Sequence, residues 1–159
     1  MKSLVTGGAG FIGSHLTDRL LSMGHEVIVV DNFSNGRPQN LAHHSGNKKL
    51  TVHKADIADF NLIEPFFKGV DWVFHVAALA DIVPSIENLM DYHRSNVDGT
   101  ASVLEASRRN NVKRLVYSAS SSCYGIPDSY PTPETSPIRP QYPYALTKNL
   151  GEQMVMHWG

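Results

Sequence analysis

The chain has 159 residues, enough for one domain with a hydrophobic core. Apolar residues make up 42%, charged residues 18%, and the formal net charge is −1, so neither nucleic acid nor an anionic membrane is an expected partner. Cys123 is the only cysteine, which excludes an intrachain disulfide and favours a reducing, cytoplasmic location. No apolar stretch approaches the ~20 residues of a membrane-spanning helix. The strand that begins close to Met1 leaves no room for a signal peptide.

Short apolar runs alternate with segments of helical periodicity along the chain. The runs predict buried strands at residues 3–6, 26–31, 50–54, 71–76 and 113–118. Helices are expected from residue 11 until Gly24, and at 59–68, 87–110 and 142–156. Residues 32–49 are expected to be mostly loop with room for one helical turn, and residues 120–140 to be loop. Near-continuous apolar strands between helices are typical of a parallel sheet covered on both faces. We therefore expect an α/β, doubly wound Rossmann fold, truncated because such sheets commonly have six or more strands.

A glycine-rich turn follows the first predicted strand. Gly7, Gly10 and Gly13 permit a tight turn, a close approach of the backbone to a pyrophosphate, and close packing of the next helix. That helix would offer free N–H groups and its positive dipole end to the phosphates. Asp31 ends the second strand, where a carboxylate accepts hydrogen bonds from a ribose 2′-hydroxyl and repels a 2′-phosphate. The pattern predicts a dinucleotide site and favours NAD over NADP, although Arg37 could reach a phosphate.

A tyrosine and a lysine lie four residues apart in the last predicted helix. Tyr144 and Lys148 therefore share one helical face. A phenol with a pKa near ~10 is a poor base at neutral pH, but a neighbouring cation favours the phenolate. Ser120, just past the fifth strand, could bind the same substrate oxygen. A Tyr–Lys pair alone is usually a chance surface pair; joined to the glycine turn and Asp31, it predicts a catalytic set of Ser120, Tyr144 and Lys148.

These motifs make the sequence resemble the extended short-chain dehydrogenase/reductase family, and within it the UDP-glucose 4-epimerase-like enzymes. The resemblance covers the whole chain. It is carried by the segments TGGAGFIG at 6–13, DNFSNG at 31–36, Asp56-Ile57, HVAA at 75–78, NVDGT at 96–100, SASSSCYG at 118–125, and Tyr144 with Lys148. It implies an NAD-dependent enzyme of which residues 1–159 form the cofactor-binding domain, with the substrate-binding second half absent.

The resemblance also implies a role for individual residues around the cofactor. Beside the glycines, the implied contacts are the backbone of Phe11 and Ile12 at the pyrophosphate, Asp31, Asn32 and Asn35 at the adenosine ribose, Asp56 and Ile57 at the adenine, Val76, Ala77, Ala78 and Ala80 along the cofactor, Ser95 nearby, Lys148 at the nicotinamide ribose, and Tyr144 as base. Asn96 is expected to be a structural hydrogen-bonding residue.

Sugar 4,6-dehydratases of this family carry Thr-Asp-Glu where this chain has Ser120-Ser121-Ser122, which argues against dehydration. The expected function is a nucleotide-sugar epimerase, with a UDP-hexose as substrate. A family reductase, a UDP-sugar decarboxylase and a non-catalytic NAD-binding module remain open alternatives. The resemblance implies a homodimer formed through the helices at 87–110 and 142–156. The eight histidines show no metal-ligand spacing, His43 and His44 fall in a polar loop, and no metal is expected.

Overall fold

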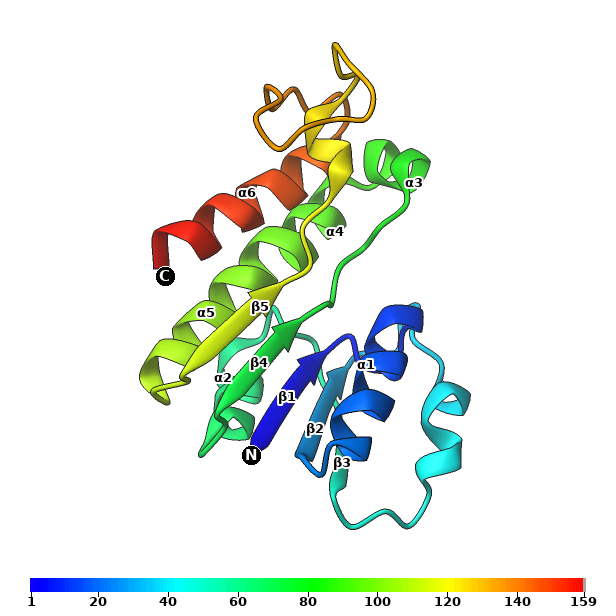
Figure 1. Cartoon of the computed structure of the whole chain (residues 1–159), viewed down its shortest axis with the longest axis vertical. Coiled ribbons are helices and arrows are strands. Elements are labelled where there is room, and N and C mark those ends of the chain that lie inside the picture. The colour runs from blue at the N-terminus through cyan, green and yellow to red at the C-terminus, as the bar shows by residue number, and fades with distance from the viewer. Residues whose placement is uncertain (159) are drawn as a thin grey trace.

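In a computed structural model, which describes residues 1–158, five parallel strands form one sheet with helices on both faces (Figure 1). The strands are β1 (Lys2–Thr6), β2 (Glu26–Asp31), β3 (Leu50–Lys54), β4 (Trp72–His75) and β5 (Arg114–Tyr117). Their order across the sheet is β3-β2-β1-β4-β5. The strand order therefore reverses between β1 and β4, where ligands bind in open α/β sheets. The expected Rossmann-type parallel sheet is confirmed.

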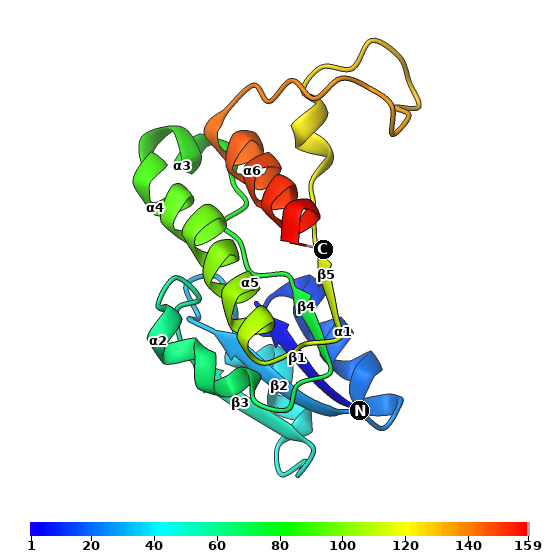
Figure 2. The same cartoon turned by 90° about the vertical axis from the view of Figure 1, so that its left-hand side faces the viewer.

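The helices of residues 1–158 lie between these strands and, in the case of the last two, after β5. They are α1 (Phe11–Ser22), η1 (Pro38–His44), α2 (Phe60–Ile63), η2 (Glu64–Phe67), α3 (Ile82–Glu87), α4 (Leu89–His93), η3 (Arg94–Asp98), α5 (Gly99–Arg109), η4 (Ser121–Tyr124) and α6 (Pro143–Trp158). α6 packs against α3, α4, η3 and α5 (Figures 1 and 2). None of the helices in residues 1–158 is long and apolar enough to cross a membrane.

The hydrophobic core has two layers, one on each face of the sheet. Side chains alternate along each strand, so neighbours such as Leu4 and Val5 enter opposite layers. In one layer the helices α2, η2 and α5 pack against β1, β2 and β4. The helices contribute Ile63 from α2, Phe67 from η2, and Val103 and Ala106 from α5, and the strands contribute Leu4, Ile28, Val30 and Val73. The other buries Leu20 of α1 and Leu41 of η1 against Val5, Val27 and Val29. Both helical layers are visible on either side of the sheet in Figures 1 and 2.

The sequence predicted one regular helix at 87–110, and this prediction is wrong, because the range holds α4, the π-helical segment η3 and α5. Asn88, with φ −129° and ψ 54°, separates α3 from α4. The segment η3 is π-helical, and the N–H of Gly99 bonds to the carbonyl of Arg94, five residues earlier. A π-helical turn is wider than an α-helical one, so the residues around Asn96 are displaced relative to a regular helix. The apolar periodicity continues across such a turn, so the sequence pattern did not reveal the π-helical segment.

Smaller differences concern the loops. The helical turn allowed within 32–49 is the 3₁₀ helix η1, whereas the segment expected as loop at 120–140 contains the 3₁₀ helix η4. The helix expected at 59–68 is one α-helical turn, capped by the Asp59 side chain, followed by the 3₁₀ helix η2. Pro65 has no N–H to continue the α-helical pattern, which accounts for the change.

A chain of hydrogen bonds joins β1, β4 and α5 beneath the carboxyl ends of the strands. His75 is fully buried, with Nδ1 2.7 Å from Thr6 Oγ1 and Nε2 2.9 Å from Thr100 Oγ1. The Thr100 hydroxyl donates its proton to the carbonyl of Asn96, at 2.6 Å, so it accepts from Nε2. Nδ1 then accepts from the Thr6 hydroxyl. Burial, aided by the charge of Lys148, lowers the pKa of His75 to about 3, so the ring is neutral.

This neutral histidine makes stability depend on pH. The pKa of about 3 in the folded protein lies below the ~6.5 of an unfolded chain, so stability is retained above pH ~6.5 and is lost as the pH falls from there towards 3. Between pH 7 and pH 5, we expect the wild-type free energy of unfolding to fall by about 2 kcal/mol more than that of the His75→Gln variant. Urea unfolding followed by circular dichroism measures both. His157→Gln, at an exposed position, should show the wild-type decrease in the free energy of unfolding between pH 7 and pH 5. An equal decrease in wild type and His75→Gln would contradict the prediction.

Candidate active site

A pocket opens at the carboxyl ends of β1 to β4. Its lining includes nine residues predicted from the sequence to contact the cofactor, namely Gly7, Gly10, Asp31, Asn32, Asn35, Ile57, Ala77, Ala78 and Ser95. The lining also contains Val30, Ser34, Gly36 and Ala55, which the sequence analysis missed although each of them adjoins a predicted residue. The pocket thus brings together residues from four strand ends and from η3 at the point where the strand order reverses.

The glycine turn forms the floor of the pocket. Gly7 has φ +69°, in the left-handed region that favours glycine, and its N–H bonds to the carbonyl of Val30 at 2.8 Å. A Cβ on Gly13 would lie 2.1 Å from the carbonyl oxygen of Gly7, so only glycine lets α1 start this close to the turn. The first helical bond runs from Ser14 to Gly10, and the N–H groups of residues 11–13 therefore have no carbonyl four residues earlier inside the helix. These groups suit a phosphate.

Asp31 connects the glycine turn to the loop that follows β2. Its side chain is buried, with Oδ2 accepting from the Ala9 N–H at 2.9 Å and Oδ1 from the Phe33 N–H at 2.8 Å. Each carboxylate oxygen keeps a further lone pair. A Cβ on Gly36 would lie 2.7 Å from Oδ1, so the loop leaves little space around the carboxylate except towards the pocket. Arg37 is held by its backbone N–H, 3.0 Å from the Ala9 carbonyl, and is exposed.

The other predicted cofactor residues are not in the lining of this pocket. They are Phe11, Ile12, Gly13, Asp56, Val76 and Ala80, together with Tyr144 and Lys148. The side chains of Phe11 and Ile12 are 79% and 59% exposed, so their expected contribution is through backbone N–H groups. Asp56 forms an ion pair with Arg94 of η3, which the sequence did not indicate because the two residues are 38 positions apart.

The three predicted catalytic residues gather between β5 and α6. The Tyr144 hydroxyl lies 3.3 Å from Ser120 Oγ, and Ser120 Oγ also accepts from the Ser122 N–H at 3.2 Å. Lys148, one turn further along α6, is only 3% exposed. Its Nζ lies 4.1 Å from the centre of the Tyr117 ring. Burial lowers the pKa of the Lys148 ammonium to about 8.

A second hollow lies beside Ser120. It is lined by Ala119, Ser120, Ser121, Cys123, Tyr124, Ile138 and Glu152. Cys123 is 1% exposed, and burial raises the pKa of its thiol, so this residue contributes as a packed side chain and not as a nucleophile. The hollow provides space next to Ser120, whose Oγ lies 3.3 Å from the Tyr144 hydroxyl.

Asn96 ties the segment that follows β4 to α6. Its Oδ1 accepts from the Leu79 N–H at 2.9 Å, while Nδ2 donates to the Leu79 carbonyl at 3.0 Å and to Thr147 Oγ1 at 3.1 Å. Thr147 directly precedes Lys148. The expected structural role of Asn96 is confirmed, and the π-helical turn η3 is the segment that presents its side chain to both partners.

The sequence matches the profile of the NAD dependent epimerase/dehydratase family over residues 3–159. The chain belongs to this family. It is 42% identical, over 155 residues, to the UDP-glucose 4-epimerase of Mycolicibacterium smegmatis, an alignment that covers 96% of this chain and 49% of that protein. The family assignment confirms the resemblance seen in the sequence and agrees with the preference for NAD deduced from Asp31.

Solved structures of family members have the same fold. The UDP-N-acetylglucosamine 4-epimerase from Methanobrevibacter ruminantium M1, in complex with UDP-N-acetylmuramic acid, is 36% identical with a TM-score of 0.93, covering 99% of this chain and 50% of that one. The UDP-glucose 4-epimerase from Bifidobacterium longum, in complex with NAD⁺ and UDP, is 33% identical with a TM-score of 0.91, covering 99% and 48%. The chain therefore spans about half the length of the epimerases it matches in this family.

The bridge made by Asn96 predicts a stability effect. Asn96→Leu should lower the free energy of unfolding by about 2–4 kcal/mol, because the N–H and C=O of Leu79 lose their partner together. Urea unfolding measures the loss. Asn88→Leu is the matched control, since Asn88 is exposed and its side-chain bond to the Pro84 carbonyl is long, at 3.4 Å. Equal losses in the two variants would show that Asn96 has no bridging role.

Proposed function

We propose that this protein is an NAD-dependent nucleotide-sugar epimerase that acts at C4 of a UDP-hexose. The observation that carries the proposal is the Tyr144 hydroxyl 3.3 Å from Ser120 Oγ, with the buried ammonium of Lys148 one helical turn away. Matched relatives named as UDP-glucose and UDP-N-acetylglucosamine 4-epimerases support the substrate class.

The pocket at the strand ends fits a dinucleotide. The N–H groups of Phe11, Ile12 and Gly13 would hold the pyrophosphate, and the fixed carboxylate of Asp31 would accept from the ribose hydroxyls. The positive φ of Gly7 leaves that part of the floor without a side chain. Ser95, Ala77 and Ala78 would line the remainder. When bound, NAD supplies a reversible acceptor for the hydride of a sugar carbon.

The catalytic residues would move one proton in each direction. Tyr144, as phenolate, takes the proton of the C4 hydroxyl while the sugar is oxidised to a ketone, and Ser120 donates a hydrogen bond to the same oxygen. Lys148 stabilises the phenolate, and its pKa of about 8 leaves it mainly protonated at neutral pH. The keto sugar would then rotate so that C4 regains a hydride on its opposite face while Tyr144 returns the proton to the oxygen, which inverts the C4 configuration.

Three alternatives differ in their products. A family reductase would use the same residues but release its cofactor, and the carboxylate of Asp31 disfavours the NADPH that such enzymes often use. A decarboxylase would convert a UDP-sugar acid, and a non-catalytic module would bind NAD without turnover.

We also propose that the protein acts in the cytoplasm as a homodimer in which α6 and the helix that runs from α4 to α5 form the paired-helix interface.

Turnover of sugar nucleotides tests the proposed chemistry. The full-length protein, with its substrate-binding half, incubated with UDP-glucose or UDP-N-acetylglucosamine without added reductant, should give the C4 epimer with no net NADH. The Tyr144→Phe and Lys148→Met variants should each lower kcat by about 10²- to 10⁴-fold, because proton transfer at the C4 oxygen loses its base or the cation that activates it. Separation of the products by anion-exchange chromatography identifies the epimer and gives kcat for the wild type and the two variants.

Tyr130→Phe serves as the control, because that side chain is 78% exposed, and its kcat should stay within about twofold of wild type. A reduced product that consumes NADH, or release of CO₂ from a UDP-sugar acid, would assign one of the other enzymes. NAD binding with no turnover of any of these substrates would assign the binding module.

Cofactor choice depends on Asp31. Asp31→Asn should weaken NAD binding by about tenfold, which is about 1.4 kcal/mol, and narrow the preference over NADP, because the amide has no charge and only one acceptor oxygen. Calorimetric titration with each dinucleotide measures the affinities. Asp128→Asn, at an exposed position, should leave them unchanged. If wild type binds NADP as tightly as NAD, Asp31 does not select the cofactor.

A further inference from the structure

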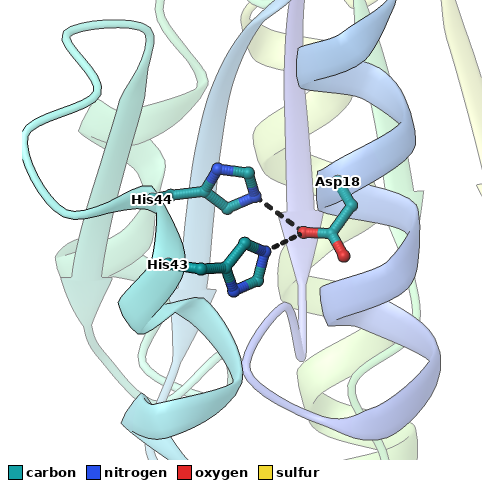
Figure 3. A group of neighbouring side chains, drawn as sticks. All are labelled: Asp18, His43 and His44. Carbon is teal, nitrogen blue, oxygen red and sulfur yellow. Dashed lines mark hydrogen bonds and ion pairs between the residues drawn. The ribbon is translucent and has the colours of Figure 1, made fainter.

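Two histidines and an aspartate converge on the face of the sheet that α1 and η1 cover (Figure 3). Asp18 lies on α1, and His43 and His44 end η1. Asp18 Oδ1 is 2.8 Å from Nε2 of His43 and 2.6 Å from Nε2 of His44. The two imidazole rings lie 4.1 Å apart with their planes at 43°. Each ring thus directs its Nε2 at the same carboxylate oxygen. The aspartate precedes the two histidines by about 25 residues, so the fold brings the three side chains together.

A third imidazole lies close to the same carboxylate. His15 is three residues before Asp18 on α1, so the two side chains share a helical face. Its Nδ1 lies 3.9 Å from Oδ2 of Asp18, on the oxygen that the other two histidines leave free. The ligand atoms within 4.8 Å of one another are those of Asp18, His43 and His44, and His15 adjoins this group through Asp18 Oδ2 alone.

The segments that carry these side chains are held in place by contacts outside the cluster. Leu41 of η1 is buried in the same core layer as Leu20 of α1. The Asn40 side chain donates to the carbonyl of Ala9 at 2.8 Å, and the Arg37 N–H bonds to the same oxygen at 3.0 Å. α1 and η1 consequently meet without help from the histidines, and the cluster is a preformed arrangement of donor atoms.

We propose that Asp18, His43 and His44 bind a zinc ion, with His15 as the fourth ligand. Zn²⁺ takes imidazole nitrogen and carboxylate oxygen in four-coordinate sites, at about 2.0–2.2 Å from each atom. Mg²⁺ and Ca²⁺ require mostly oxygen ligands, and a single carboxylate does not supply them. The ligand atoms of the first three residues all lie within 4.8 Å of one another.

Metal binding requires side-chain adjustment and a change of tautomer, because Nε2 of His43 and Nε2 of His44 each donate a proton to Asp18 Oδ1 without metal, and that proton must move to Nδ1 before Nε2 can bind the ion. In a tetrahedral site neighbouring ligand atoms are roughly 3.3 Å apart, so the present N–O separations must widen by less than an ångström. The side chains of His15 and His43 are 68% and 55% exposed and can turn, while that of His44, at 17%, is the most fixed of the three histidines.

The ion would cross-link α1 to η1. The helix η1 follows the loop whose residues Asn32 and Asn35 line the pocket. The zinc site does not depend on the proposed epimerase activity, because none of its ligands lines the pocket or contacts the catalytic residues. Its expected consequence is greater stability of the α1–η1 contact, since a ligand that binds only the folded state raises the melting temperature.

Calorimetric titration of the EDTA-treated protein with ZnCl₂ tests the site. We expect one ion per chain with a Kd below about 10 µM, a rise in Tm on adding ZnCl₂, and at least about tenfold weaker binding in His43→Ala, His44→Ala and Asp18→Asn. Titration with Co²⁺ should give the visible absorption of a tetrahedral centre in wild type and lose it in these variants. His15→Ala should weaken binding as well, and an unchanged affinity there would remove His15 from the ligand set.

His93→Ala is the matched control, because His93 is an exposed helical histidine whose Nδ1 lies 3.7 Å from a single carboxylate, that of Asp98. Its zinc affinity should equal that of wild type. Circular dichroism without metal checks that each variant is folded, and the exposed position of His43 makes His43→Ala the variant least able to disturb the fold. The proposal is overturned if no saturable binding occurs below about 1 mM ZnCl₂, or if His43→Ala and His44→Ala bind zinc as tightly as wild type.

Discussion

The neutral imidazole of His75 is the constraint on which the rest of the site depends. It must accept a hydrogen bond at Nδ1 and donate one at Nε2 at the same time, because the Thr100 hydroxyl is already committed to the Asn96 carbonyl. A single tautomer satisfies both, and it fixes the ring between β1, β4 and α5. A protonated ring would have two donors, and the hydroxyl of Thr6 would then have to accept from it. The low dielectric of the core makes that exchange costly.

The same network extends to both walls of the site. Thr6 Oγ1 accepts from the N–H groups of Val76 and Ala77, each at 3.2 Å, which sets the path of the chain where it leaves β4 towards the pocket. Asn96 binds Leu79 further along that path and Thr147 in α6. Within residues 1–158 every buried side-chain N and O atom has a hydrogen-bond partner. The pocket wall and the helix that carries Tyr144 are therefore positioned by one set of bonds and not by independent loops.

Local patterns in the sequence were sufficient for the strands, the glycine turn and Asp31. Each depends on residues close together in the chain, such as an apolar run or a glycine spacing, and the family resemblance extended the prediction to Ser95 and Ala77. Features that depend on residues far apart were not found. The π-helical turn leaves the apolar periodicity unbroken, and the pairing of Asp18 with His43 requires the fold to bring α1 beside η1. Tertiary packing, which no local spacing encodes, decides such contacts.

The burial of Lys148 costs the folded chain desolvation free energy. An ammonium that is 3% exposed has lost most of its hydration, and the lowered pKa of about 8 measures that loss. The face of the Tyr117 ring, 4.1 Å from Nζ, returns part of the energy, and Glu152 one turn further along α6 adds a favourable charge. A leucine would fill the same space without the cost of desolvation. A buried cation one turn from a tyrosine is an arrangement suited to stabilising a phenolate, because the low-dielectric surroundings that make the charge costly also strengthen its effect on a neighbouring group.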